Sequence, residues 1–258
     1  MRIVVPLKVV PDTYGERTLS LETGLADRTP SDAVLDEIGE RALEVALAYA
    51  DEHPDTEVVA LAMAPELALT GLRKALATGA TDACLVVDER LVGADVVLTA
   101  EVLAAAVHHL GFDLVVAGDI STDGGGGAVP AALAEVLGVP AATSLREVRI
   151  TGTEVAGVRA ADGADVQVSA PLPAVVSITE ALPAARMPGF KGIIAAKKKT
   201  IETLTTADLG IDPEDPDAAR SIMTAIAARP PRTAGTTIVD DGDAGRRLAE
   251  FLVENRLA

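Results

Sequence analysis

The chain has almost no aromatic residues and a single cysteine. Its 258 residues include no Trp, two Tyr and three Phe, although 49% of them are hydrophobic. We therefore expect a core of Ala, Val, Leu and Ile, which suits parallel strands covered by helices. The lone Cys84 excludes an internal disulfide and a four-thiolate iron–sulfur cluster within this chain. Its apolar neighbours predict a small buried side chain.

Positive charge and long apolar runs are also scarce. The 22 Lys and Arg residues stand against 39 Asp and Glu residues, giving a net charge of −17. No basic field would offset the repulsion of nucleic-acid phosphates, so nucleic acid is not expected as a partner. No run of about 18 apolar residues occurs, which argues against stable membrane insertion. The N-terminus enters a strand pattern without signal-peptide features, so we expect a cytoplasmic protein.

Patterns for catalysis and metal binding are missing as well. His53, His108 and His109 lack metal-ligand spacing, and adjacent side chains on a helix point in different directions. No Ser/His/Asp or Cys/His set is spaced for hydrolysis. We therefore assign no catalytic residue and no metal ligand.

Strand-like and helix-like segments alternate along most of the chain. This alternation predicts βαβ units and an α/β fold with a doubly wound, mostly parallel sheet. Ligands of such sheets bind beyond the carboxyl ends of the strands, so the loops after Leu7, Ala62 and Ala117 should share one edge. Strands are expected at Ile3–Leu7, Glu57–Ala62, Ala83–Val87, Leu114–Ala117 and Ala174–Ile178, and helices near Leu35–Ala50, Glu66–Thr78, Ala94–His109 and Ala128–Leu137.

Two segments depart from this alternation. Arg146–Ala170 alternates apolar and polar residues around Asp162-Gly163, a pattern typical of an antiparallel hairpin. After Ser177 the periodicity fades and prolines recur, until a short amphipathic helix near Ala244–Asn255. We expect an α/β domain over residues 1–184 and a C-terminal extension over 185–258. The extension has too little core to fold alone, so it should wrap around a partner or lie along the domain.

The most informative segment is a glycine-rich loop between an expected strand and an expected helix. The strand Leu114–Ala117 ends at Gly118, a polar loop covers Asp119–Gly127, and the helical pattern opens at Val129, followed by Pro130 in the first turn. Bare backbone N–H groups and the positive end of the helix dipole favour an anion, and glycine permits close approach. The loop predicts an anionic ligand such as a nucleotide, with a merely flexible loop as the alternative. It matches neither Gly-x-Gly-x-x-Gly nor a Walker P-loop.

Three segments of the sequence, including this loop, become informative when they are taken together. They are IVVPLKVVPDT at the N-terminus, GDISTDGGGGAVPAALAEVLGVP around the loop, and LPAVVSITEALPAARMPGFKGIIAAKKKTIETLTTADLGID. In this order they resemble the beta subunit of electron transfer flavoproteins, whose members share the Ala-Lys-Lys-Lys run and the Asp-Leu-Gly turn. The resemblance covers nearly the whole chain, and the RPPRTAG segment of the tail fits it too.

The resemblance implies half of a heterodimeric electron carrier, not an enzyme. The partner would be an alpha subunit with most of the contacts to a redox-active FAD shared between the subunits. This chain would bind a structural AMP, or a second FAD, in its own nucleotide pocket. Electrons would arrive from primary, acyl-CoA-type dehydrogenases and leave to a downstream acceptor.

The resemblance also implies which residues contact the nucleotide. Asp123 would order the loop or contact ribose while neighbouring N–H groups cradle the phosphate, with a ligand-free Asx turn as the alternative. Family members often have Gln or Thr where residues 126–128 are Gly-Gly-Ala, so contacts would fall on backbone donors. Lys8 would meet a phosphate or an acid of another loop, unless it is an exposed charge. The implied set is Pro6, Lys8, Ala33, Met63, Asp123, Gly124, Gly125, Gly126, Gly127, Ala128 and Val129.

Two members of this set carry alternatives of their own. In the segment SDAVLDE, Ala33 and the following valine stand where the family often has Asn-Pro, so only backbone contacts to adenine would survive. The alternative for this segment is a helix N-terminus capped by Ser31 or Asp32. Met63 would line the adenine pocket or fill the core.

A second implied set lies in the extension. The segment from Arg186 to Lys199 matches the loop through which family members recognise dehydrogenases, with Phe190 at the position of the family's apolar anchor. Aromatic side chains are favoured as interface anchors, and the alternative is a Phe190 that folds back onto the tail. The lysine run would be a solvated turn or a contact to an acidic partner. The implied partner-binding residues are Arg186, Phe190, Lys197, Lys198 and Lys199.

Two other functions fit the same scaffold. An enzyme of the nucleotide-alpha-hydrolase type would adenylate a substrate, but it needs a catalytic lysine or metal-binding acids that the glycine loop does not supply. A stand-alone nucleotide sensor of the universal-stress kind would have no use for a partner-wrapping arm. Yellow colour found chiefly in a complex with a second subunit would separate these functions from the electron carrier.

Overall fold

The computed structural model describes residues 1–15, 18–28, 32–232 and 235–257. Its contacts divide the chain into two compact units, Met1–Thr224 and Ala225–Ala258. The first unit therefore continues past residue 184 and includes the first part of the extension. Within the described ranges, no helix combines the length and the apolarity needed to cross a bilayer.

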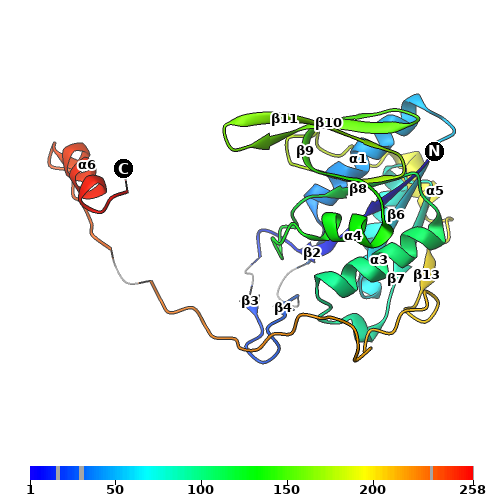
Figure 1. The fold of residues 1–258 in the computed structure, drawn as a ribbon, viewed down its shortest axis with the longest axis horizontal. Helices are drawn as coiled ribbons and strands as arrows, with labels where there is room; N and C mark the ends of the chain where they lie inside the picture. Colours follow the sequence, from blue (N-terminus) through cyan, green and yellow to red (C-terminus); the bar gives the residue numbers. More distant parts are fainter. Residues whose placement is uncertain (16–17, 29–31, 233–234, 258) are drawn as a thin grey trace. The chain divides into compact units, whose positions relative to one another are not determined.

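A nine-stranded sheet forms the centre of the first unit (Figure 1). Its strands are β1 (Arg2–Pro6), β6 (Glu57–Met63), β7 (Asp82–Val86), β8 (Leu114–Gly118), β9 (Ala141–Ile150), β10 (Glu154–Ala161), β11 (Ala164–Pro171), β12 (Ala174–Ile178) and β13 (Glu202–Leu204). They are ordered β11-β10-β9-β12-β8-β1-β6-β7-β13. In this order, every neighbouring pair in the part β9-β12-β8-β1-β6-β7-β13 is parallel. Strand β10 pairs antiparallel with both β9 and β11. The predicted mostly parallel α/β sheet with an antiparallel hairpin is confirmed.

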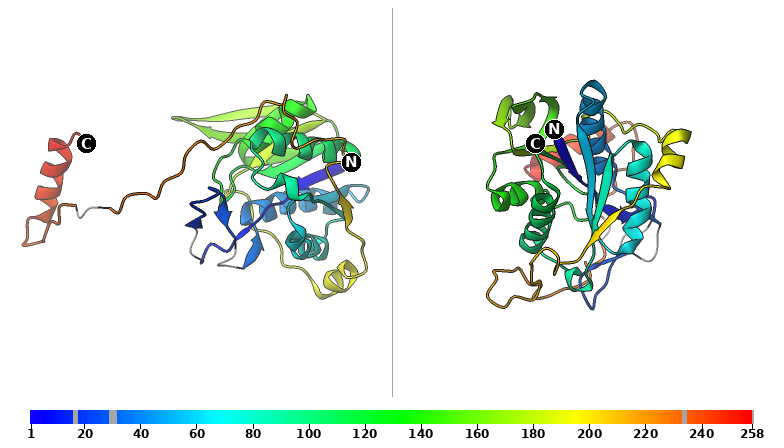
Figure 2. Two further views of the ribbon diagram at one scale, coloured as in Figure 1. Left: turned by 90° about the horizontal axis from the view of Figure 1, so that it is seen from below. Right: turned by 90° about the vertical axis from the view of Figure 1, so that its right-hand side faces the viewer.

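Helices cover both faces of this sheet (Figure 2). On one face lie α1 (Glu37–Glu52), α2 (Leu69–Thr78) and α5 (Phe190–Ala196), and on the other α3 (Val96–Leu110) and α4 (Val129–Leu137); η1 (Glu66–Ala68) and η2 (Glu89–Leu91) are single 3₁₀ turns. Because successive side chains of a strand alternate, Ile3 and Val5 pack under α1 and α2 while Val4 packs under α3 and α4. Cys84 is fully buried, as expected, and burial raises the pKa of its thiol to about 12.

Two small antiparallel pairs occupy the connection between β1 and α1. They are β2 (Val9–Pro11) with β5 (Ala33–Leu35) and β3 (Thr18–Leu19) with β4 (Ala26–Asp27). Pairing of β5 with β2 delays the start of α1 to Glu37, with Asp36 as the N-cap residue. The predicted cap at Ser31 or Asp32 is therefore wrong. Asp32 precedes β5, and Ser31 lies outside the described residues.

The extension contributes a helix to the domain. Gly192 of α5 faces the backbone of α2, where a Cβ would overlap the carbonyl oxygen of Ala77. Arg73 of α2 donates to the carbonyl of Lys199 at 2.5 Å, and the Lys199 ammonium donates to the carbonyl of Ala80 at 3.0 Å. Part of the segment expected to be a recognition loop is therefore a helix fixed at its C-terminal end.

The extension also adds the last strand of the sheet. β13 pairs with β7, and the turn after β13 buries Thr206 completely. The Thr206 hydroxyl donates to Asp88 and accepts from Arg90 Nη2 at 2.8 Å. The hydrogen bond from Arg90, and after it the one from Thr206, holds the pKa of Asp88 well below its ordinary value. This ionised cluster ties the extension to the carboxyl end of β7.

Beyond this turn the chain follows α3 to the end of the first unit. Arg220 Nη2 pairs with Glu101 at 2.6 Å, and the Ser221 amide donates to Asp95, the N-cap of α3, at 2.6 Å. The second unit holds α6 (Ala244–Glu254), in which no side chain is buried. The described residues of this unit, 225–232 and 235–257, include no buried hydrophobic side chain, and we call the unit the arm.

We expect Gly192→Ala to detach α5 from α2. The new methyl group collides with backbone, which cannot rotate away, so the free energy of unfolding should fall by about 1–3 kcal/mol. Urea unfolding followed by far-UV circular dichroism measures the change. Gly189→Ala is the matched control, because a Cβ there meets no atom within 4 Å. Equal stability of both variants would contradict the close packing of α5.

Candidate functional site

The carboxyl ends of the parallel strands meet at one edge of the sheet. From β1 the chain moves to β6 and β7 on one side and then to β8 on the other side of β1. The strand order therefore reverses between β1 and β8, the position at which doubly wound sheets bind ligands. The loops after Leu7, Ala62 and Ala117 share this edge, as predicted.

A buried carboxylate connects the loops at this reversal point. Asp123 Oδ1 accepts from Lys8 Nζ and from the Gly124 amide, both at 2.6 Å, and Oδ2 accepts from Arg28 Nη2 at 2.8 Å. The Asp123 side chain is only 6% exposed. Burial alone would raise its pKa, but the hydrogen bond and charge of Lys8, and the hydrogen bond of Arg28, hold the pKa well below its ordinary value. Lys8 thus meets an acid of another loop, as predicted.

A second carboxylate fixes the start of the glycine loop. Asp36, which is 1% exposed, accepts from the Thr122 amide at 2.8 Å and donates its own amide to the carbonyl of Lys8 at 2.9 Å. Among the described residues its Oδ1 has no hydrogen-bond partner. At the end of β8, burial raises the pKa of Asp119. The approach of α1 is close here, because a Cβ at Gly118 would lie 2.7 Å from Ile38.

The glycines of the loop differ in backbone conformation and in the space around them. Gly125 and Gly127 have positive φ angles of +64° and +62°, which favour glycine. Gly126 has no such angle, and a Cβ there would meet no atom within 4 Å. The chain itself therefore does not require glycine at residue 126. A ligand that approaches the backbone would require it.

The other predicted cofactor residues lie on several elements of the fold. Pro6 and Met63 are the last residues of β1 and β6, and Met63 packs partly into the core under α3. Ala33 is exposed on β5. Ala128 is the N-cap of α4 and Val129 its first residue, as expected. Sequence reasoning missed Arg28, since its contact with Asp123 spans 95 residues and no local motif marks it.

The predicted partner-binding residues divide into free and engaged ones. Phe190 begins α5 and is 78% exposed beside Met187 and Ile194, so it does not fold back onto the tail. Arg186 is engaged by Glu44 at 2.9 Å and by a second carboxylate of α1. Lys199 is engaged by backbone carbonyls. The exposed lysines of this segment are Lys191, Lys197 and Lys198.

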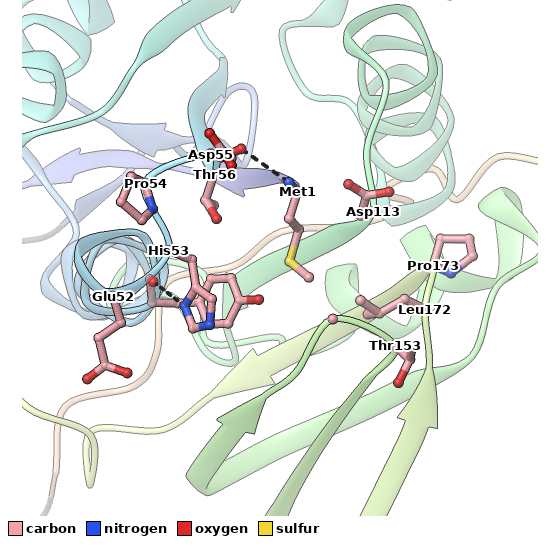
Figure 3. Close-up of a pocket in the computed structure, with 12 residues that line it drawn as sticks. Met1, Glu52, His53, Pro54, Asp55, Thr56, Asp113, Thr153, Leu172 and Pro173 are labelled. Atoms are coloured by element: carbon pink, nitrogen blue, oxygen red, sulfur yellow. Dashed lines mark hydrogen bonds between the residues drawn. The ribbon is translucent and has the colours of Figure 1, made fainter.

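A cavity of about 740 Å³ lies at the opposite edge of the sheet (Figure 3). Met1 and Asp113, which precede β1 and β8, face it together with His53, which stacks on Tyr49 at 4.0 Å. Its rim carries the carboxylates of Glu52 and Asp55. We place the candidate site at the glycine loop, because ligands of such sheets bind beyond the carboxyl ends of the strands.

The sheet order defines a doubly wound α/β protein with a glycine-rich loop between β8 and α4. A family model described as electron transfer flavoprotein domain matches residues 24–209. Proteins named electron transfer flavoprotein subunit beta from Mycobacterium bovis and Mycobacterium leprae are 42% and 41% identical over 262 aligned residues, which cover 99% of this chain and 98% of theirs. The Bacillus subtilis protein of that name is 32% identical over 216 residues, 83% of each chain. The chain belongs to the electron transfer flavoprotein family, as a beta subunit.

We expect Gly126→Val to lower the amount of nucleotide bound by this subunit severalfold. The branched side chain fills the space that an approaching phosphate needs, without a clash inside the chain. Mass spectrometry of nucleotides released on denaturation measures the occupancy. Gly152→Val is the matched control, because a Cβ at Gly152 also meets no atom within 4 Å and its turn lies at the other edge of the sheet. Full occupancy in both variants would remove the loop from the nucleotide site.

Proposed function

We propose that this chain is half of a heterodimeric electron carrier. With an alpha subunit it accepts electrons from primary, acyl-CoA-type dehydrogenases and passes them to a downstream acceptor. The observation that carries this proposal is the glycine loop, which Asp123 ties to Lys8 and Arg28 at the sheet's reversal point, in a chain of this family. A cytoplasmic location stays a prediction.

The residues at the loop fit a nucleotide phosphate. The Gly126 and Gly127 amides, which have no hydrogen-bond partner among the described residues, and the N-terminus of α4 supply donors, and Gly126 leaves room for the anion. Adenine would lie toward Pro6, Ala33 and Met63. AMP and FAD share the adenosine phosphate that these residues would hold, so either fits. When bound, the FAD shared with the alpha subunit supplies the redox chemistry.

Two features of the extension support its use as a partner-binding segment. Phe190 and Ile194 on α5, and Met187 shortly before it, are exposed apolar side chains on a segment that is anchored to α2, and we assign this apolar patch to the donor dehydrogenase. The arm ends in α6, whose apolar side chains Leu248 and Phe251 remain exposed. We assign this face to the alpha subunit.

The alternative functions receive less support. An adenylating enzyme needs metal-binding acids at the loop, but both oxygens of Asp123 already accept hydrogen bonds, from Lys8, Arg28 and the Gly124 amide. A stand-alone sensor would leave both the apolar patch and the arm without a role. Co-expression of this chain with its alpha subunit tests the proposal. We expect yellow colour chiefly in the complex and AMP or a second FAD among the released nucleotides. A chain ending at Thr224 should bind the alpha subunit more weakly. A colourless complex, or one without a second nucleotide, would contradict the proposal.

We expect Phe190→Ala to weaken reduction of the complex by its donor dehydrogenase. Loss of an interface aromatic anchor costs about 2 kcal/mol or more, so the apparent KM should rise roughly thirtyfold. Flavin absorbance should stay unchanged, because Phe190 lies on α5 away from the glycine loop. Tyr14→Ala, which removes a fully exposed aromatic ring elsewhere, is the control. An unchanged KM, or a loss of flavin that accounts for the defect, would exclude Phe190 from the interface.

A further inference from the structure

Arg28 reaches the glycine loop from a segment that no nucleotide-binding motif includes. It follows β4, in the connection between β1 and α1. Its Nη1 donates to the carbonyl of Val9 on β2 at 3.2 Å, and its Nη2 donates to Asp123 at 2.8 Å. One guanidinium therefore joins the connection to both the exit of β1 and the loop after β8.

Asp123 is buried, whereas its two cationic partners are partly exposed to solvent. The Asp123 side chain is 6% exposed and both its oxygens accept bonds from protein donors, whereas Lys8 and Arg28 are 47% and 41% exposed. The carboxylate is thus saturated, while both cations keep N–H groups that face solvent. Among the described residues, Asp123 is the one carboxylate that forms an ion pair with Lys8 or Arg28, so the two cations share a single partner.

Both cations also border the start of the glycine loop. Lys8 Nζ lies 3.3 Å from Ser121 Oγ and would lie 3.6 Å from a Cβ at Gly124. Arg28 bonds to the carboxylate immediately before Gly124. The two cations therefore lie shortly before the Gly126 and Gly127 amides, which have no hydrogen-bond partner among the described residues, and such a combination of cations and amides is usual in a phosphate site.

We propose that Arg28 is a phosphate-binding residue of this subunit. Together with Lys8 it clamps the phosphate of the bound adenine nucleotide, and Asp123 positions both cations for that contact. The guanidinium offers paired N–H groups that match phosphate oxygens, which an ammonium does not. The inference rests on the proposed function, since it assumes an adenine nucleotide at the glycine loop. It adds a phosphate-specific role for a residue outside that loop.

A comparison of AMP with adenosine tests this role. The co-expressed complex is stripped of its nucleotide by dialysis against denaturant and refolded, and calorimetry then measures AMP and adenosine binding. We expect Arg28→Gln to weaken AMP binding about tenfold or more and to leave adenosine binding unchanged. The AMP affinity of Arg28→Lys should fall between those of the wild type and Arg28→Gln. Arg149→Gln, which removes an exposed arginine of the hairpin, is the control for net charge.

The outcomes separate this inference from the proposed function. Equal weakening of AMP and adenosine would mean that Arg28 only shapes the pocket, and unchanged AMP binding would mean that it does not touch the phosphate; either overturns the inference. A wild-type complex that prefers AMP to adenosine would still support nucleotide binding at the loop. Failure of the wild-type complex to bind AMP would instead overturn the nucleotide site itself, and the clamp with it. Arg28→Lys keeps the charge, so its partial rescue also rules out simple misfolding.

Discussion

The Asp123 carboxylate, held between Lys8 and Arg28, is the interaction on which the candidate site depends. A carboxylate this deeply buried is costly unless charged donors surround it, and both its oxygens have such donors. Through it, the exit of β1, the connection from β2 to β5 and the glycine loop hold a single arrangement. A glycine-rich loop alone would sample many conformations. The contacts of Asp123 with Lys8, Arg28 and the Gly124 amide fix the start of this loop.

The extension makes many contacts with the domain as far as Thr224, whereas α6 has no buried side chain. β13, the Asp88 cluster and the Arg220–Glu101 pair fasten it to the first unit as far as Thr224. α5 is fastened through its C-terminal end, so Phe190 projects from a fixed base. A recognition surface on a fixed base loses little conformational entropy on binding. In the arm after Thr224, α6 has no buried side chain, and we propose that a partner surface covers it.

Continuous apolar runs made the parallel strands predictable from sequence, and glycine density made the loop predictable. The features that sequence reasoning missed depend on contacts distant in the chain. The start of α1 is set by pairing of β5 with β2, which overrides the capping preference of the residues before it. β13 is too short for its own periodicity and forms because β7 offers an edge. Arg28 contacts Asp123 across 95 residues, and Arg186 is engaged by Glu44 across 142.

Local charge at the two proposed binding sites differs from the charge of the whole chain. The net charge is −17, yet Lys8 and Arg28 lie at the glycine loop, and exposed lysines at residues 191, 197 and 198 lie in the same segment as Phe190. We propose that the first two cations serve a phosphate and that the lysines favour an acidic partner, because opposite charges speed and orient encounter. On this proposal the positions of a few cations, rather than the net charge of the chain, determine where this subunit binds.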